Sequence, residues 1–349
     1  MKILFYTDPH WSQYSSILRS RGTFFSTRLE NLIYSINWAE EQAGYYGCNA
    51  IIIGGDFFDS SYLNAEEISA LQHIRWAPVS HVFLAGNHET NVSNLEYNTA
   101  DLFKLCQNSV VVSTPEQYTI ADTSCEFCFL PYVLERDRKS LTEYFGPKPN
   151  DKHRIIFSHN DLKDVNYGNF VSPEGFELAD IDANSDLFIN GHIHHYSKVN
   201  SKVINGGNLT GQNFTEDNSY RHGVIILDTE TLEYQFIDNP YAIHFEKLDY
   251  SGIKNIHTIF NKLSSITKPS VLTIKVREEF VPEVKNYLRD TFHMHLFEYR
   301  IIASRELAEE VIEKVDFKEI DHIKQFQSYV LAKIGDSQAI KDELAALFT

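Results

Sequence analysis

Residues 50–59 read Ala50-Ile51-Ile52-Ile53-Gly54-Gly55-Asp56-Phe57-Phe58-Asp59, and this stretch decides the fold. A short apolar run is typical of a buried strand, the glycines permit a tight turn, and two carboxylates follow at once. Four other apolar runs also end in a polar motif. These motifs are Asp8-Pro9-His10, Gly86-Asn87-His88-Glu89, Ser158-His159-Asn160 and Gly191-His192-Ile193-His194. Because open α/β sheets gather ligand-binding groups beyond the carboxyl ends of their strands, we expect these segments to form one site.

The first two-thirds of the chain alternates strand-like and helix-like stretches. Strands are expected at Ile3–Tyr6, Ala50–Ile53, Val82–Ala85, Ile155–Phe157 and Leu187–Ile189. Helices are expected around Leu29–Ala39, Ala65–Trp76 and Asn94–Cys106. Later runs leave little room for helices and predict a second, partly antiparallel sheet from Glu126–Leu130, Lys202–Ile204, Gly223–Leu227 and Tyr234–Ile237. The expected fold class is α/β, a two-sheet sandwich flanked by helices.

A domain boundary is expected near Asn239-Pro240. Beyond it a strand, helix, strand, helix and strand follow in that order, which predicts a small α+β domain. The pattern then becomes helical, with an apolar stripe that includes Phe326, Val330 and Leu331. The predicted divisions are a main domain over residues 1–242, the small domain over 243–304 and terminal helices over 305–349.

The composition is that of a globular protein. A chain of 349 residues with 43% hydrophobic content can bury a sizeable core. Its net charge of −17 argues against a surface coated in basic residues for nucleic acid. No stretch approaches the roughly 18 apolar residues needed to span a bilayer, and the first residues turn polar too soon for a signal peptide. We therefore expect a cytoplasmic protein without membrane contact.

The cysteines do not form a disulfide framework in a chain of this length. Cys125-Glu126-Phe127-Cys128 matches a C-x-x-C pattern, but no second pair completes a zinc site. The pattern lies in an expected strand, where alternate residues face opposite ways, so we interpret both cysteines as structural.

One segment departs from the acidic balance of the chain. No acidic residue occurs between Asp8 and Glu30, whereas Arg19, Arg21 and Arg28 do. Two interpretations stay open. The arginines are solvated loop residues at a buried helix start, or they contact the phosphates of DNA.

The polar motifs supply ligands for two divalent ions. Carboxylate, amide and imidazole groups without thiolate favour manganese, iron or zinc at a catalytic centre over a structural zinc site. One ion would be held by Asp8, His10 and His194, the other by Asn87, His159 and His192, with Asp56 as the bridge.

His88 is the residue that we do not assign to a metal. It follows the expected ligand Asn87, and from there it would donate a proton or a hydrogen bond to a departing oxygen. Asp59 would accept from the other ring nitrogen of His88 and keep it oriented and protonated.

The order D-x-H, G-D-x-x-D, G-N-H-E, H and G-H-x-H resembles that of the calcineurin-like metallophosphoesterase superfamily over roughly residues 1–240. This resemblance implies two-metal hydrolysis of phosphoesters with the roles given above, including the pairing of His88 with Asp59. Ser60 follows Asp59 where protein phosphatases of the superfamily have arginine. Three segments instead resemble SbcD-type DNA repair nucleases, namely Phe129–Tyr132, Asn205–Thr210 and His222–Asp228.

The SbcD-type resemblance implies a DNA nuclease subunit in which residues 243–304 form a DNA-binding capping domain. It implies 3′-to-5′ exonuclease action on duplex ends and endonuclease action on single strands. The expected cofactors are two divalent ions, Mn²⁺ first, with Mg²⁺, Fe²⁺ and Zn²⁺ as alternatives. The chain length resembles that of versions carried by tailed phages, which would place it in the host cytoplasm.

The same resemblance implies three partners: DNA ends, an SbcC-type coiled-coil ATPase and a second copy of the chain. The homodimer would form near Ala65–Trp76 and Asn94–Cys106. Phe326, Val330 and Leu331 would dock to the ATPase, or the terminal helices pack on the chain's own core. The rival functions are a phosphodiesterase or phosphatase for small or cyclic nucleotides, and a non-catalytic adaptor that retains metals.

Overall fold

The computed structural model describes residues 1–14, 22–91, 94–119, 124–167, 171–216, 219–291 and 296–304. Its strands are β1 (Lys2–Tyr6), β2 (Ala50–Ile53), β3 (Ser80–Leu84), β4 (Thr90–Asn91), β5 (Asn94–Asn98), β6 (Ser109–Val112), β7 (Glu116–Thr119), β8 (Cys125–Leu130), β9 (His153–Ser158), β10 (Leu187–Asn190), β11 (Ser197–Lys198), β12 (Val203–Asn205), β13 (Gly223–Asp228), β14 (Tyr234–Asp238), β15 (His244–Asp249), β16 (Ser270–Arg277) and β17 (Leu296–Ser304). Its α-helices are α1 (Thr27–Tyr46), α2 (Ala65–Leu71), α3 (Leu141–Phe145), α4 (Leu178–Asn184), α5 (Ile256–Ser264) and α6 (Val281–Thr291). Short 3₁₀ helices are η1 (Thr99–Leu105), η2 (Glu135–Asp137) and η3 (Glu278–Phe280).

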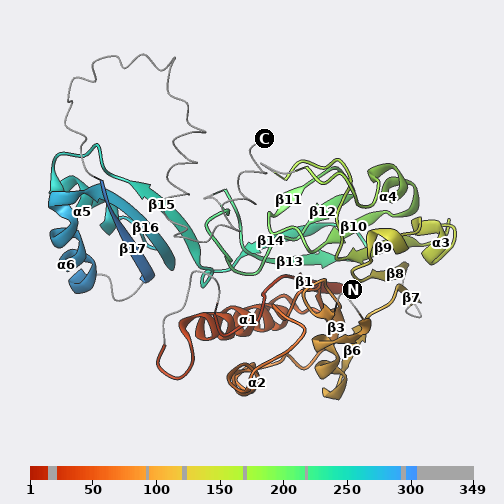
Figure 1. Cartoon of the computed structure of the whole chain (residues 1–349). Coiled ribbons are helices and arrows are strands. Elements are labelled where there is room, and N and C mark those ends of the chain that lie inside the picture. Colours follow the sequence, from red (N-terminus) through yellow and green to blue (C-terminus); the bar gives the residue numbers. More distant parts are fainter. Residues whose placement is uncertain are drawn as a thin grey trace, which may run out of the picture. The chain divides into compact units, whose positions relative to one another are not determined.

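The first of two large sheets has six strands in the order β14-β13-β1-β2-β3-β6 (Figure 1). The strands β1, β2, β3 and β6 are parallel, and β13 runs antiparallel to β1. The sequence of strand β2 is continuously apolar because both faces of the strand are buried. Ile51 and Ile53 pack against the helices, whereas Ile52 packs against the second sheet.

The second sheet also has six strands, in the order β11-β12-β10-β9-β8-β7, with β8, β9, β10 and β12 parallel. The core between the sheets includes a stack of Phe5, Phe157 and Phe129, with neighbouring ring centroids 5.9 and 5.7 Å apart. Cys125 faces this core and Cys128 faces the opposite side of β8. This confirms that the C-x-x-C pair is divided between two faces.

Helices cover the outer faces of both sheets. The helices α1 and α2 pack on the first sheet, and α3 and α4 pack on the second (Figure 1). Helix α1 begins where Oγ of Ser26 accepts a hydrogen bond from the Leu29 amide, and it ends at Gly47 in the left-handed conformation. Among the described residues, no helix is long and apolar enough to cross a bilayer. The predicted α/β sandwich with flanking helices is confirmed.

Two expectations about its elements are wrong. Strands β13 and β14 extend the first sheet through β1 instead of joining the second. Residues 94–106 form strand β5 and the 3₁₀ helix η1 in place of an α-helix. The cause is similar in both cases, since a short apolar run does not specify which strand it will pair with, and pairing overrides local propensity.

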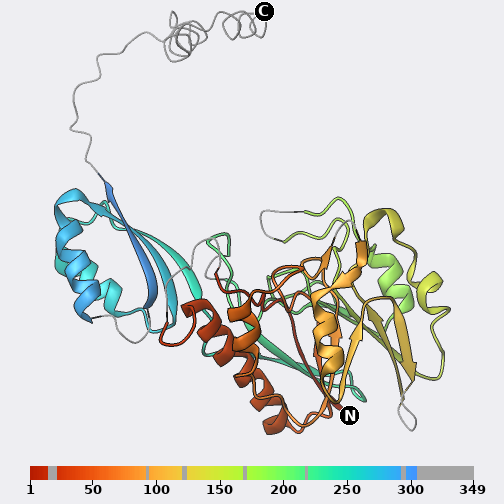
Figure 2. The same cartoon turned by 60° about the horizontal axis from the view of Figure 1, so that its bottom comes forward.

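The strands β15, β16 and β17 form a separate parallel sheet. Figures 1 and 2 both show α5 and α6 on one face of it. Leu272, Ile274 and Val276 alternate along β16 and pack against these helices. Residues 1–304 form one compact unit, and residues 305–349 lie outside the described residues. The boundary at residue 242 stays a prediction.

Candidate metal centre

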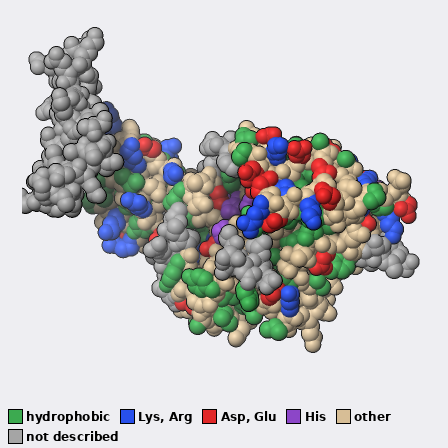
Figure 3. Space-filling view, turned by 45° about the vertical axis from the view of Figure 1, so that its right-hand side comes forward, with side chains coloured by type: hydrophobic (Ala, Val, Ile, Leu, Met, Phe, Trp, Pro, Cys, Tyr) green, Lys and Arg blue, Asp and Glu red, His purple; other side chains and the backbone are tan. Residues whose placement is uncertain are grey.

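The polar motifs come together at the carboxyl ends of β1, β2, β3, β9 and β10. Ligand atoms within 4.8 Å of one another form three overlapping groups: Asp8, His10 and His194; Asp56, His159 and His192; and His10, Asp56 and His88. Asn87 contacts the second group through its amide oxygen. Figure 3 shows histidine side chains that reach the surface on one face of the molecule. All of the predicted ligands therefore lie in one place, as expected for groups that follow the carboxyl ends of strands in α/β sheets.

The backbone at this site adopts conformations that side chains rarely allow. Asp8, His10, Asp56 and His192 have φ angles of 53°, 50°, 48° and 65°. Gly55 and Gly86 provide close approach, because a Cβ on Gly55 would collide with the imidazole of His159 and one on Gly86 with the carboxylate of Asp56. Such strain persists only where surrounding structure imposes it, and it concentrates at functional sites.

Asp8 has one satisfied and one unsatisfied carboxylate oxygen. Its Oδ2 accepts hydrogen bonds from the Thr7 hydroxyl and from the His192 amide at 3.0 Å. Its buried Oδ1 has no hydrogen-bond donor among the residues that the structure describes. That oxygen lies 3.8 Å from Nε2 of His10 and 3.7 Å from Nε2 of His194. A buried acceptor without a donor is costly, so this oxygen fits a cation ligand for the first ion.

In the second group, hydrogen-bond acceptor atoms of different residues face one another. Nδ1 of His159 donates to the Gly54 carbonyl at 2.6 Å, which leaves the Nε2 lone pair free in the neutral ring. That Nε2 lies 3.3 Å from the amide oxygen of Asn87, which is itself 3.0 Å from Nδ1 of His192. A cation must stand among these atoms, either a proton or a metal ion. The donor set fits a second divalent ion.

Asp56 reaches both groups. Its Oδ2 lies 3.8 Å from Nε2 of His10 and 3.2 Å from Nε2 of His159. Its Oδ1 accepts from the His88 amide at 2.9 Å, which fixes the carboxylate. The geometry fits the predicted bridging role, although the assignment of each ligand to one ion remains our prediction.

His88 lies at the exposed edge of the site, with 42% of its side chain accessible. Its Nδ1 is 3.1 Å from the backbone oxygen of Asp59 and 3.6 Å from the carboxylate. That carboxylate lies closer to His10, with 3.0 Å between Oδ1 and Nδ1. Asp59 therefore has a second partner that the sequence did not predict, because one of its oxygens orients an expected metal ligand.

The predicted DNA contact at Arg28 is wrong, because this side chain is buried and only 1% exposed. Its guanidinium donates to the carbonyls of Pro9 and Gly211 at 2.9 and 3.0 Å and to Oε1 of Gln212 at 2.6 Å. Burial lowers the pKa of Arg28 to about 10. Its role is to join the segment of Asp8 and His10 to the loop at residues 211–212. Arg19, Arg21, Phe326, Val330 and Leu331 lie outside the described residues.

Three carboxylates at the site were not assigned a role from the sequence: Glu89, Asp161 and Glu216. The buried Glu89 accepts from the amides of Gly86 and Phe58 at 2.7 and 3.1 Å, which ties two of the ligand-bearing turns together. Burial and the nearby charge of Asp56 raise the pKa of Glu89 to about 8. Asp161 lies 3.4 Å from Nε2 of His192. The motif position of Glu89 was a usable signal, whereas Glu216 follows no motif.

The match to a family model agrees with this arrangement. A family model described as calcineurin-like phosphoesterase matches residues 1–196, more than half of the chain. Among solved structures, a dimetal phosphatase from Danio rerio is similar, with 12% sequence identity and a TM-score of 0.38 over 68% of this chain and 98% of that chain. Comparison with curated proteins gives no match.

Proposed function

The chain belongs to the calcineurin-like phosphoesterase family, and on this premise we propose that it cleaves the phosphodiester bonds of DNA. Family membership makes it a hydrolase of phosphoesters that depends on two metal ions. The finer proposal is a nuclease subunit of an SbcCD-type repair complex, with 3′-to-5′ exonuclease and single-strand endonuclease action. Mn²⁺ is the proposed ion.

The residues of the centre have distinct tasks in this reaction. When bound, two divalent ions would activate the attacking water and neutralise the phosphate. Asp59 and the Gly54 carbonyl hold His10 and His159 with Nε2 directed into the cluster. His88 is partly exposed and would donate a proton or hydrogen bond to the leaving oxygen.

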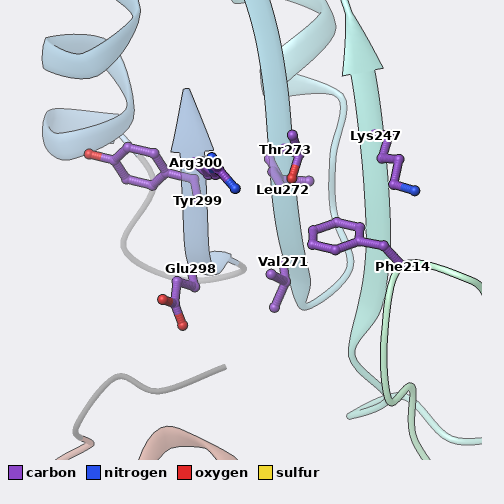
Figure 4. A pocket seen from close by; sticks show the side chains of 8 residues that line it. All are labelled: Phe214, Lys247, Val271, Leu272, Thr273, Glu298, Tyr299 and Arg300. Atoms are coloured by element: carbon purple, nitrogen blue, oxygen red, sulfur yellow. The ribbon is translucent and has the colours of Figure 1, made fainter. Parts of the chain in front are cut away.

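The observation that carries the choice of DNA is a cavity of about 510 Å³ on the open face of the β15–β16–β17 sheet (Figure 4). The strand register sets Lys247, Thr273 and Arg300 side by side across the three strands. Phe214 reaches this face from outside the sheet, with Nζ of Lys247 5.7 Å from its ring centroid. The face thus combines two cations with an aromatic ring, and the carboxylate of Glu298 also lines the cavity.

This combination suits a nucleic-acid strand, which offers phosphates to cations and bases to aromatic rings. Within the described part of the chain, neither Lys247 nor Arg300 has a carboxylate partner. Although the chain has a net charge of −17, the residues described at this cavity include two cations and one carboxylate, which leaves a local excess of positive charge. Phe214 also belongs to the loop that Arg28 joins to the metal centre through Gly211.

The test compares two substrates in two double variants. Lys247→Ala with Arg300→Ala should weaken DNA binding about 10- to 100-fold. The slope of log K against log salt concentration should become shallower by nearly two, because two phosphate contacts are lost. Lys254→Ala with Lys285→Ala removes the same charge elsewhere on the small domain and serves as the control. Hydrolysis of a small chromogenic phosphodiester should be unchanged in both. Mn²⁺-dependent cleavage of small nucleotides without cleavage of linear DNA would refute the DNA proposal and leave the family activity standing.

The proposal includes an SbcC-type coiled-coil ATPase as partner and a second copy of the chain. An acidic chain repels DNA at a distance, so a partner with a basic surface would assist binding. The segment that contains Phe326, Val330 and Leu331 remains the proposed ATPase contact. Co-purification of the full chain with a long coiled-coil ATPase supports this part, and its absence from active complexes would oppose it.

A further inference from the structure

A buried carboxylate from the loop after β12 contacts an expected metal ligand. Glu216 is 5% exposed, and its Oε1 lies 3.2 Å from Nδ1 of His194. The ligand itself comes from the distant turn after β10. A buried carboxylate is expensive unless it is paired and hydrogen-bonded, so its surroundings indicate what it does.

Glu216 is held in one orientation by groups other than His194. Nδ2 of Asn208 donates to Oε1 at 3.0 Å, and the Gln212 amide donates to Oε2 at 3.0 Å. Nε2 of His222 lies 3.9 Å from Oε2. The carboxylate is therefore held in place independently of His194, so it can impose an orientation on the His194 ring.

His10 and His194 have matching environments. Nδ1 of His10 lies 3.0 Å from the carboxylate of Asp59, as Nδ1 of His194 lies 3.2 Å from that of Glu216. The two Nε2 atoms are only 3.1 Å apart. With each Nδ1 proton donated to a carboxylate, both neutral rings direct an Nε2 lone pair toward the same point. Such an arrangement requires a cation between them.

We propose that Glu216 is a positioning residue that holds His194 in the tautomer and orientation needed to bind the first ion. Carboxylates that accept from the remote nitrogen of a ligand histidine also raise its basicity toward the metal. This inference rests on the two-metal part of the proposed function and does not depend on DNA as the substrate. It makes the ions unequal, since Asn87, His159 and His192 have no contact with Glu216 among the described residues.

The experiment titrates the metal-free full chain with Mn²⁺ and measures affinity and stoichiometry by calorimetry, with elemental analysis after desalting. Glu216→Ala should weaken one of the two ions about 10- to 100-fold and leave the other at wild-type affinity. Glu216→Gln keeps an oxygen that accepts from Nδ1, so it should recover most of that loss.

Asn208→Ala removes one anchor of Glu216 but keeps the carboxylate that accepts from His194, so it should weaken the same ion by less than Glu216→Ala does. Thermal unfolding of each metal-free variant reports whether the fold is retained. Wild-type affinity for both ions in Glu216→Ala would overturn the inference. So would equal weakening of both ions, since that result indicates a purely structural role. Because no phosphoester is present, failure of the DNA proposal would not alter these results.

Discussion

Oδ1 of Asp59 lies 3.0 Å from Nδ1 of His10, an expected metal ligand, and this contact gives Asp59 a task beyond its neighbour His88. Asp59→Ala should therefore weaken Mn²⁺ binding about 10- to 100-fold as well as slow hydrolysis. The measurement is metal content after desalting, together with the rate at saturating Mn²⁺. Glu233→Ala, at an exposed carboxylate in the turn between β13 and β14, is the control. Full metal occupancy with a reduced rate would mean that Asp59 acts through His88 alone.

His88→Ala should separate chemistry from metal binding. Its side chain is 42% exposed and contacts Asp59 through Nδ1, so its removal leaves the buried ligand set in place. Hydrolysis should fall about 10²- to 10⁴-fold while both ions and most substrate affinity are retained. Asp56→Ala provides the contrast, because loss of the carboxylate that we predict to bridge the two ions should release metal. A His88 variant that loses an ion on elemental analysis would show that His88 is itself a ligand.

A third prediction concerns stability away from the metal centre. Arg154 is buried on the second sheet, where Nε donates to the Glu126 carboxylate at 2.5 Å and Nη2 donates to the Phe145 carbonyl at 3.1 Å. Arg154→Ala leaves the carboxylate nearly buried without its partner, so it should cost about 3–5 kcal/mol in the free energy of unfolding. Urea denaturation measures this loss. Arg75→Ala breaks an exposed pair with Glu41 and should cost about 1 kcal/mol or less. Equal costs would contradict the role of burial.

The sequence predicted the site better than it predicted the sheets. Each expected ligand follows an apolar run, and parallel strands necessarily direct their carboxyl ends to one edge, so Asp8, Asn87 and His159 could be placed together without knowing strand order. The position of β13 beside β1 depends on pairing between residues more than 200 positions apart, as Leu4 with Ile226 shows. No local pattern encodes such a partner.

Residues that act through long-range contacts were the ones that sequence reasoning missed. Arg28 looks like a surface cation in sequence, but four acceptors from distant segments, including Pro9 and Gly211, make its burial possible. Glu216 has no motif of its own and is recognisable only by its contact with His194. Hydrogen-bond networks of this kind depend on tertiary structure, so they are not predicted by composition or by the spacing of residues in the sequence.

The last prediction concerns pH and His244, which lines a cavity of about 490 Å³ with His222 and Lys268. Burial, followed by the charge of Lys268, lowers the pKa of His244 from 6.5 to about 4. The unfolded chain therefore binds a proton at higher pH than the folded chain does. The stability that the neutral His244 contributes to the folded protein is fully present above the unfolded pKa, and it is lost as pH falls from about 6.5 toward 4. His244→Gln removes the titration, so the stability of wild type relative to this variant should fall by about 1–2 kcal/mol between pH 8 and pH 5, less than a fully buried ring would give. Denaturation of both metal-free proteins at the two pH values measures this difference, in which the titration of the metal ligands cancels. A difference that is constant with pH, or that grows as pH falls, would show that His244 does not resist protonation in the folded protein.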